Sequence, residues 1–184
     1  SGHVRIYDWI DSAWIQRGAD IDGEAAEDFS GYSVSMSADG QTVAIGAYGN
    51  DGNGSYSGHV RIYDWIDSAW IQRGDDIDGE AVDDQSGRSV SMSADGQTVA
   101  IGATGNDGNG GLSGHVRIYD WTGSAWIQRG ADIDGEAAYD ESGTSVSMSA
   151  DGQTVAIGAA GNDGNGSNSG HVRIYDWTDS GWIQ

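Results

Sequence analysis

The stretch that most constrains the fold is Ser33-Val34-Ser35-Met36-Ser37-Ala38-Asp39-Gly40-Gln41-Thr42-Val43-Ala44-Ile45-Gly46. Polar and apolar residues alternate strictly over 33–37, and a second apolar run follows the Asp-Gly pair. Period-two alternation is typical of a β-strand. Asp-Gly between two such runs is the strongest short-range signal for a β-hairpin. We therefore expect two antiparallel strands joined by a turn at 38–41.

This stretch recurs because the whole chain is repetitive. The sequence that opens at Ser1 with Ser-Gly-His-Val-Arg-Ile-Tyr-Asp-Trp returns at Ser57, Ser113 and Ser169, a constant spacing of 56 residues. A fixed period above about 20 residues indicates a solenoid, a propeller or another array. No linker of different composition separates the copies, so we treat 1–184 as one array. Its units are 1–56, 57–112 and 113–168, followed by a partial unit at 169–184.

Each unit contains four short candidate strands. In the first full set they are 33–37, 42–47, 58–65 and 70–73, and no segment sustains a helical period. Four short strands per unit, joined by loops rich in Gly, Asp and Asn, describe a blade of a β-propeller. The predicted fold class is therefore all-β, a β-propeller built of 56-residue, four-stranded antiparallel blades.

Three motifs of the unit resemble the FG-GAP repeat, which builds the propeller of integrin α chains and of many secreted microbial proteins. They are Ser30-Gly31-Tyr32-Ser33-Val34, Thr42-Val43-Ala44-Ile45-Gly46-Ala47 and Gly58-His59-Val60-Arg61-Ile62-Tyr63. The pattern departs at the Phe-Gly pair, because Ser30 separates Phe29 from Gly31. The WD repeat is the alternative family, although its usual period is shorter than 56 residues. Either family implies a propeller.

The FG-GAP resemblance also implies the order of the strands in a blade, with 33–37 innermost and 70–73 outermost. Complete blades then lie at about 31–74, 87–130 and 143–184, and residues 1–18 supply only the outer half of a blade. Three blades and a half-blade are too few to close a ring. We therefore expect self-association or membership of a longer chain.

The charge balance excludes some partners. The chain has 29 acidic and 8 basic residues and a formal net charge of -21. A polyanion such as nucleic acid would be repelled, and an anionic membrane surface is disfavoured for the same reason. No apolar run is long enough for membrane insertion. The absence of Cys excludes disulfides and thiolate metal sites.

An acidic segment follows the fourth strand of each unit and carries carboxylates at relative positions 1, 3, 5 and 9. Calcium takes six to eight oxygen ligands from a flexible loop, and FG-GAP propellers carry calcium loops with this spacing, so the resemblance implies a calcium cofactor. The alternative is a solvated turn that caps its own backbone, because the Gly and the loop position both differ from those of the family. The candidate ligands are Asp20, Asp22, Glu24, Asp28, Asp76, Asp78, Glu80, Asp84, Asp132, Asp134, Glu136 and Asp140.

Catalysis is not expected, because nothing with catalytic residue types breaks the repeat symmetry. His3, His59, His115 and His171 share one repeat position at a strand start. Equivalent residues of separate blades lie too far apart to share a metal ion, so we expect these His residues to be structural. The Trp pairs, such as Trp65 and Trp70, are expected to pack blade against blade rather than to bind sugars.

The near-identical units differ mainly in two sets of loops. In a propeller, the loops after strands two and four emerge on one face, whereas the 38–41 turn lies on the other and is identical in all units. Diversified loops on a constant scaffold are where binding usually resides, although drift after duplication is the alternative. The candidate partner-binding residues are Tyr32, Tyr48, Tyr56, Arg88 and Tyr139.

The sequence therefore predicts a non-enzymatic binding or adhesion module of the extracellular space or cell surface, with a protein or glycan as its ligand. The alternative is a structural protomer of an extracellular ring or filament. Asn53 and Asn165 lie in glycosylation sequons, which are relevant in a secreted eukaryotic protein.

Overall fold

Each full repeat folds into an antiparallel sheet whose strands pair in chain order. The computed structural model describes residues 1–184 and contains strands and loops but no helix. The four main strands of the first sheet are β5 (Ser33–Met36), β6 (Thr42–Ala47), β7 (His59–Ile66) and β8 (Ala69–Gln72), and a short fifth strand joins them. The second sheet likewise has β10 (Ser86–Met92), β11 (Thr98–Ala103), β12 (His115–Trp121) and β13 (Trp126–Gln128) with a short fifth strand. The third consists of β15 (Ser142–Met148), β16 (Thr154–Ala159), β17 (His171–Thr178) and β18 (Gly181–Ile183).

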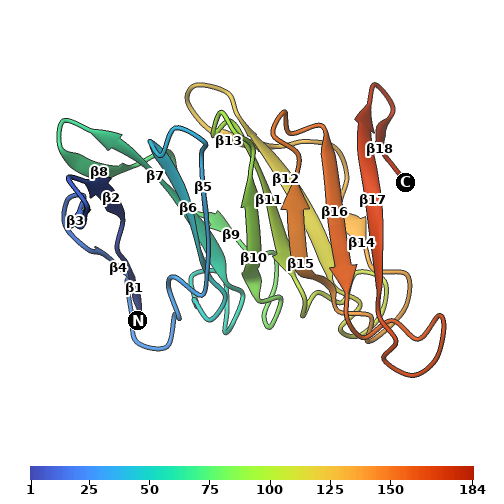
Figure 1. Ribbon diagram of the computed structural model, residues 1–184. Helices are drawn as coiled ribbons and strands as arrows, with labels where there is room; N and C mark the ends of the chain where they lie inside the picture. Colours follow the sequence, from blue (N-terminus) through green and yellow to red (C-terminus); the bar gives the residue numbers. More distant parts are fainter.

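The three sheets lie side by side in chain order, and the termini lie at opposite ends of the array (Figure 1). The first residues form two small sheets, in which β1 (His3–Val4) pairs with β4 (Ile21–Asp22) and β2 (Tyr7–Ile10) pairs with β3 (Ala13–Gln16). The strands predicted at 33–37, 42–47, 58–65 and 70–73 agree with the structure to within one or two residues. The predicted all-β, propeller-type fold is confirmed.

Three two-residue strands were not predicted. They are β4 (Ile21–Asp22), β9 (Ile77–Asp78) and β14 (Ile133–Asp134), and each begins an acidic segment. β9 pairs with the start of β7, whereas β8 pairs with its end. The segment forms this short ladder because Ile77 is buried between two sheets, with 5% of its surface exposed. The segment between blades is therefore partly strand rather than loop throughout.

The predicted 38–41 turn forms between β5 and β6, and side chains hold it closed. The Ser37 hydroxyl donates to Asp39 Oδ1 (2.7 Å) and accepts from the backbone N–H of Thr42 (2.9 Å). Gly40 takes a positive φ of 67°, which glycine adopts without steric cost. The turn spans residues 37–41, so it is longer than the two-residue connection most often found at Asp-Gly pairs.

The core lies at the junctions between sheets rather than within one sheet. Ala44, Val60 and Ile62 of the first sheet form one buried cluster with Val99 and Ile101 of the second. The same arrangement recurs between the second and third sheets. Apolar side chains therefore join successive repeats face to face, as expected for an array whose units cannot bury their faces alone.

An Arg that follows each of the outer strands β3, β8 and β13 ties its sheet to the next one. Arg73 Nε donates to Asp64 Oδ2 (2.6 Å), and Arg73 Nη1 donates to the carbonyl oxygen of Gly96 (2.8 Å) in the next β10–β11 turn. The guanidinium also lies 5.7 Å from the ring centroid of Trp121, within the range of a cation–π contact. The turn on this face thus has a packing role in every repeat.

The close approach of neighbouring sheets gives a first prediction. A Cβ added at Gly102 would overlap both the Ser89 hydroxyl and the carbonyl oxygen of Gly143 in the next sheet. We expect Gly102→Ala to lower the free energy of unfolding by about 1–3 kcal/mol, the usual cost of overpacking. Chemical denaturation measures this change.

The control for that experiment is Gly158→Ala. Gly158 occupies the same repeat position in the third unit, where a Cβ meets only the equivalent Ser145 hydroxyl closely and no following sheet. Equal destabilisation by the two substitutions would contradict the face-to-face packing of repeats.

Candidate functional site

The loops after the second and fourth strands contact one another on one face, which we call the loop face. It comprises residues 19–32, 48–58, 75–88, 104–114, 131–144 and 160–170. The backbone N–H of Gly49 donates to the carbonyl oxygen of Asp28 (3.2 Å), and the Asn53 side-chain amide donates to the carbonyl oxygen of Gly79 (2.8 Å). Each glycine-rich loop therefore lies between two successive acidic segments. This matches the predicted common face.

Three of the five candidate partner-binding residues meet at one place on the loop face. The Tyr32 and Tyr48 rings pack edge to face at 4.6 Å between centroids, and Phe29 stacks on Tyr48 at 5.1 Å. The Arg88 guanidinium lies 4.9 Å from the Tyr32 ring and 5.0 Å from the Tyr48 ring. Although Arg88 comes from the following repeat, it completes this group. We call Phe29, Tyr32, Tyr48 and Arg88 the aromatic cluster.

A small cavity of about 160 Å³ adjoins the aromatic cluster, and Arg88 belongs to both. Six of its seven lining residues occupy positions at which the repeats differ, and the seventh is Gly105. These six are Gln85, Arg88, Thr104, Leu112, Glu141 and Thr144. Most of the differences between repeats therefore lie on the loop face, and a smaller set lies at the turn between the third and fourth strands, as at Ile66 and Thr122.

The other two candidate residues, Tyr56 and Tyr139, lie outside the aromatic cluster. Tyr56 is half-buried, and its backbone N–H donates to Asp51 Oδ1 (2.8 Å). Tyr139 is 68% exposed. Both residues remain on the loop face, but no aromatic or cation–π contact joins their rings to the cluster.

Several variable positions of the loop face have a left-handed backbone. The φ values of Phe29, Tyr56 and Tyr139 are 55°, 52° and 68°. A non-glycine residue in this region costs of order 1–3 kcal/mol, and such residues gather at functional sites. Glycine would remove the strain, yet bulky side chains occupy these positions.

The carboxylates of one acidic segment do not converge on a point. Asp20 accepts from Gln16 Nε2 (2.7 Å) and from Arg5 Nε (2.9 Å), and these hydrogen bonds lower the pKa of Asp20. Asp28 is 3% exposed and accepts from the backbone N–H of Ala25 (2.7 Å), so it caps its own turn. Asp84 and Asp140 cap their turns in the same way. The geometry does not support a calcium cage made by one segment, and calcium binding itself stays a prediction.

Acidic segments of neighbouring repeats do converge, and a buried His lies between them. The His59 side chain is 2% exposed, and its Nδ1 lies 3.4 Å from Asp76 Oδ2 and 3.9 Å from Glu24 Oε2. Burial lowers the pKa of His59, and Asp76 opposes this effect. The cluster recurs one unit later as Glu80, His115 and Asp132.

This arrangement is not apparent when the four equivalent His residues are compared only with one another. The relevant partners are carboxylates from two successive acidic segments, at relative positions 5 and 1. A search for ligand sets that cross the repeat boundary would have found them.

The sequon residue Asn53 has a structural role. Its side-chain amide donates to the carbonyl oxygens of Gly79 (2.8 Å) and Glu80 (3.2 Å). Asn109, which is not in a sequon, makes the equivalent pair of bonds. A glycan on Asn53 would remove one of the two amide hydrogens. No such bonds are formed by Asn165, and glycosylation of either residue stays a prediction.

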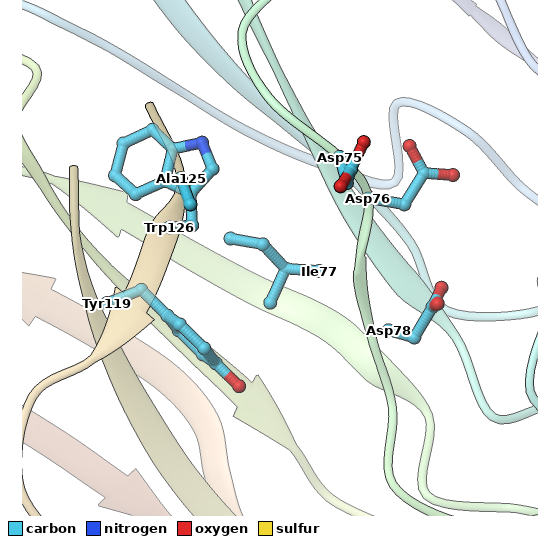
Figure 2. Close-up of a pocket in the computed structure, with 7 residues that line it drawn as sticks. All are labelled: Asp75, Asp76, Ile77, Asp78, Tyr119, Ala125 and Trp126. Carbon is cyan, nitrogen blue, oxygen red and sulfur yellow. The ribbon is translucent and has the colours of Figure 1, made fainter. Parts of the chain in front are cut away.

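A cavity of about 220 Å³ lies at the junction of the first and second sheets, away from the aromatic cluster. Figure 2 shows Ile77 pointing toward Tyr119 and Trp126, whereas Asp76 and Asp78 point away from these rings. Trp126 Nε1 donates to the carbonyl oxygen of Arg73 (3.0 Å) in the preceding repeat. The Trp residues therefore contribute to packing between repeats, as predicted.

Comparison with known proteins agrees with this architecture. The sequence profile described as the FG-GAP repeat matches residues 20–63 and 133–175, each running from an acidic segment to the third strand of the following sheet. The chain contains FG-GAP repeats. Residues 76–119 of the intervening unit are nearly identical to both. No curated protein sequence matches the chain. The structure has no helix that is long and apolar enough to span a membrane.

Solved structures that resemble these FG-GAP repeats share the fold at low sequence identity. A putative 6-phosphogluconolactonase from Bacteroides uniformis has a TM-score of 0.64 and 12% identity, covering 98% of this chain and 49% of its own. The periplasmic gluconolactonase PpgL of Pseudomonas aeruginosa has a TM-score of 0.54 and 14% identity, covering 97% and 50%. Hydrazine synthase of Kuenenia stuttgartiensis has a TM-score of 0.52 and 18% identity, covering 83% and 35%. The chain thus spans half or less of each of these proteins.

Proposed function

We propose that this FG-GAP repeat array is a non-enzymatic, extracellular recognition module that binds a protein partner through its loop face. The observation that carries the proposal is the concentration of repeat-to-repeat differences in the aromatic cluster and the adjoining cavity. Drift after duplication is the alternative, and the packing of Tyr32, Tyr48 and Phe29 with Arg88 of the next repeat favours recognition over it.

The chemistry of the aromatic cluster favours a protein over a glycan as the ligand. Tyr and Arg are enriched among the residues that dominate protein interfaces. Tyr32 is 52% exposed and Phe29 is 43% exposed, so both rings are available to a partner. The chain as a whole has a formal net charge of -21. A basic partner surface would therefore associate faster at low salt than at high salt.

A non-enzymatic role is supported by the distribution of reactive side chains. The His residues repeat in every unit, and the variable positions carry no His, Cys or Lys. An extracellular location is supported by the FG-GAP repeats, which are typical of extracellular proteins. Adhesion to a cell surface is one form that such recognition takes.

Alanine substitutions on the loop face test the proposal. We expect Tyr32→Ala and Arg88→Ala each to weaken binding of the partner by about 2 kcal/mol or more, about 30-fold, as for central interface residues. Gln97→Ala is the control, because Gln97 is exposed on the opposite turn. Surface plasmon resonance with the immobilised chain measures the affinities, and thermal melting verifies folding. Unchanged affinity in both loop-face variants, with loss in Gln97→Ala, would refute the proposal.

A structural protomer is the second candidate function, and one observation favours it. Val172 and Ile174 are 66% and 57% exposed, whereas Val60 and Ile62 at the same repeat positions are 0% and 1% exposed. The face of the third sheet therefore has the chemistry of a sheet junction. Assembly of copies into a ring or filament, or a further repeat of a longer chain, would cover it. Light scattering over a range of concentrations distinguishes assembly from a stable 19.2 kDa particle.

A further inference from the structure

We propose that Glu24, His59 and Asp76 bind a divalent transition-metal ion, with Zn²⁺ as the best match, and that Glu80, His115 and Asp132 form a second site of the same kind. In each cluster one nitrogen and two carboxylate oxygens lie within 4.8 Å of one another. Each site joins two successive repeats, because Glu24 follows β4 of one unit whereas His59 lies on β7 of the next sheet.

The spacing of the donor atoms fits a metal ion better than direct ion pairs. His59 Nδ1 lies 3.4 Å and 3.9 Å from its two carboxylates, and no hydrogen bond joins them. Ligand distances of about 2.0–2.2 Å around tetrahedral zinc place neighbouring ligand atoms about 3.4 Å apart. In the second cluster His115 Nδ1 lies 3.7 Å from Asp132 Oδ2. A metal ion between these atoms needs only small side-chain movements.

The buried His side chains are the independent sign of a ligand. The side chains of His59 and His115 are 2% and 1% exposed and make no hydrogen bond, and the Nδ1 of each faces the carboxylates. Each ring is buried without a hydrogen bond, so the carboxylates that its Nδ1 faces are its nearest polar partners, and a bound ion would satisfy that nitrogen. The two carboxylates would balance the charge of the ion.

The surroundings support the carboxylates as ligands. Glu24 presents Oε2 to His59, while its Oε1 lies 3.5 Å from Arg61 Nη1. Arg117 lies at the same distance from Glu80 Oε1. Outer partners of this type orient ligating carboxylates. Glu24 is 49% exposed and Asp76 is 29% exposed, so an ion has access from solvent.

The nitrogen donor decides between metals. Calcium prefers six to eight oxygen ligands, whereas imidazole suits zinc and its neighbours in the first transition row. The proposed ion therefore differs in kind and in place from the calcium implied by the spacing of one acidic segment.

The third repeat provides a matched control. His171 Nδ1 lies 3.7 Å from Glu136 Oε2, but no described Asp completes this set, and only two complete clusters occur. The chain should therefore bind two zinc ions and not three.

Zinc titration of the intact chain tests the proposal. We expect calorimetry with ZnCl₂ to show two bound ions per native chain. The single variants His59→Gln and His115→Gln should each bind one ion, and the double variant should bind none. The control variant His171→Gln should still bind two. Because the buried His substitutions risk the fold, Glu24→Gln and Glu80→Gln provide a second set. Because each Glu is itself a proposed ligand, we expect each substitution to weaken its own site by at least the 10–100-fold that losing an outer partner of a ligand costs.

A zinc-dependent rise in melting temperature should be present in the native chain and absent when both His residues are replaced. Excess CaCl₂ should not displace the zinc. The proposal fails if the native chain binds no zinc at micromolar concentration, or if calcium displaces zinc at equal concentration. It also fails if the double variant His59→Gln/His115→Gln and the double variant Glu24→Gln/Glu80→Gln both retain two ions.

Discussion

Replacing Ile62 with alanine should lower the free energy of unfolding by about 2–5 kcal/mol, the range for a large-to-small change in a core. Ile62 is 1% exposed and lies in the buried cluster that joins the first two sheets. Its truncation leaves a cavity at the junction, because sheets on both sides are held in place by backbone hydrogen bonds. Denaturation by urea, followed by Trp fluorescence, measures the change.

The same substitution at Ile174 is the matched control. This residue occupies the same repeat position but is 57% exposed, so we expect Ile174→Ala to change stability by no more than about 0.5 kcal/mol, as for most surface substitutions. Ile118→Ala repeats the test at the second junction, where the residue is 0% exposed. Similar losses at Ile62 and Ile174 would show that the sheets do not pack as described.

Replacing Arg73 with methionine should cost about 2–3 kcal/mol. Methionine keeps an apolar stem against Trp121 but removes the hydrogen bonds to Asp64 and to the Gly96 carbonyl oxygen. Breaking a buried ion pair costs about 3–5 kcal/mol, because one charge is left without a partner. We expect less here, since Arg73 and Asp64 side chains are 13% and 20% exposed. Thermal or urea denaturation provides the measurement.

Arg5→Met is the control for the Arg73 experiment. Arg5 also forms an ion pair with a carboxylate, Asp20, but its side chain is 47% exposed. Exposed ion pairs often contribute nothing measurable to stability. If Arg5→Met and Arg73→Met are equally destabilising, the link between successive sheets is not what gives Arg73 its role.

Much of the fold was predictable because the repeat multiplied every local signal. The alternation at 33–37 and the Asp-Gly turn predicted one hairpin, and the period placed its copies along the chain. The short strands β4, β9 and β14 were not predictable in this way. Two residues carry no period, and Ile77 forms a strand only because β7 and the next sheet surround it.

The candidate site was predictable in part. Differences between repeats identified Tyr32, Tyr48 and Arg88, but only the structure shows that they meet across a repeat boundary. The calcium site predicted within one acidic segment was not found. The linear spacing of its carboxylates predicted that they surround one ion, yet Asp20 contacts Arg5, Asp28 caps its own backbone and Glu24 faces the next sheet. Linear spacing does not determine the direction in which a side chain points.

Site-specific photo-cross-linking tests most directly whether the loop face is the recognition surface. A photoreactive amino acid is placed at Tyr32 in one variant and at Gln97, on the opposite turn, in another. Each folded variant is irradiated in its native milieu, and the cross-linked products are identified by mass spectrometry. The account predicts a specific protein cross-link from position 32 and none from position 97. A specific cross-link from position 97 alone, or from neither position, would contradict it.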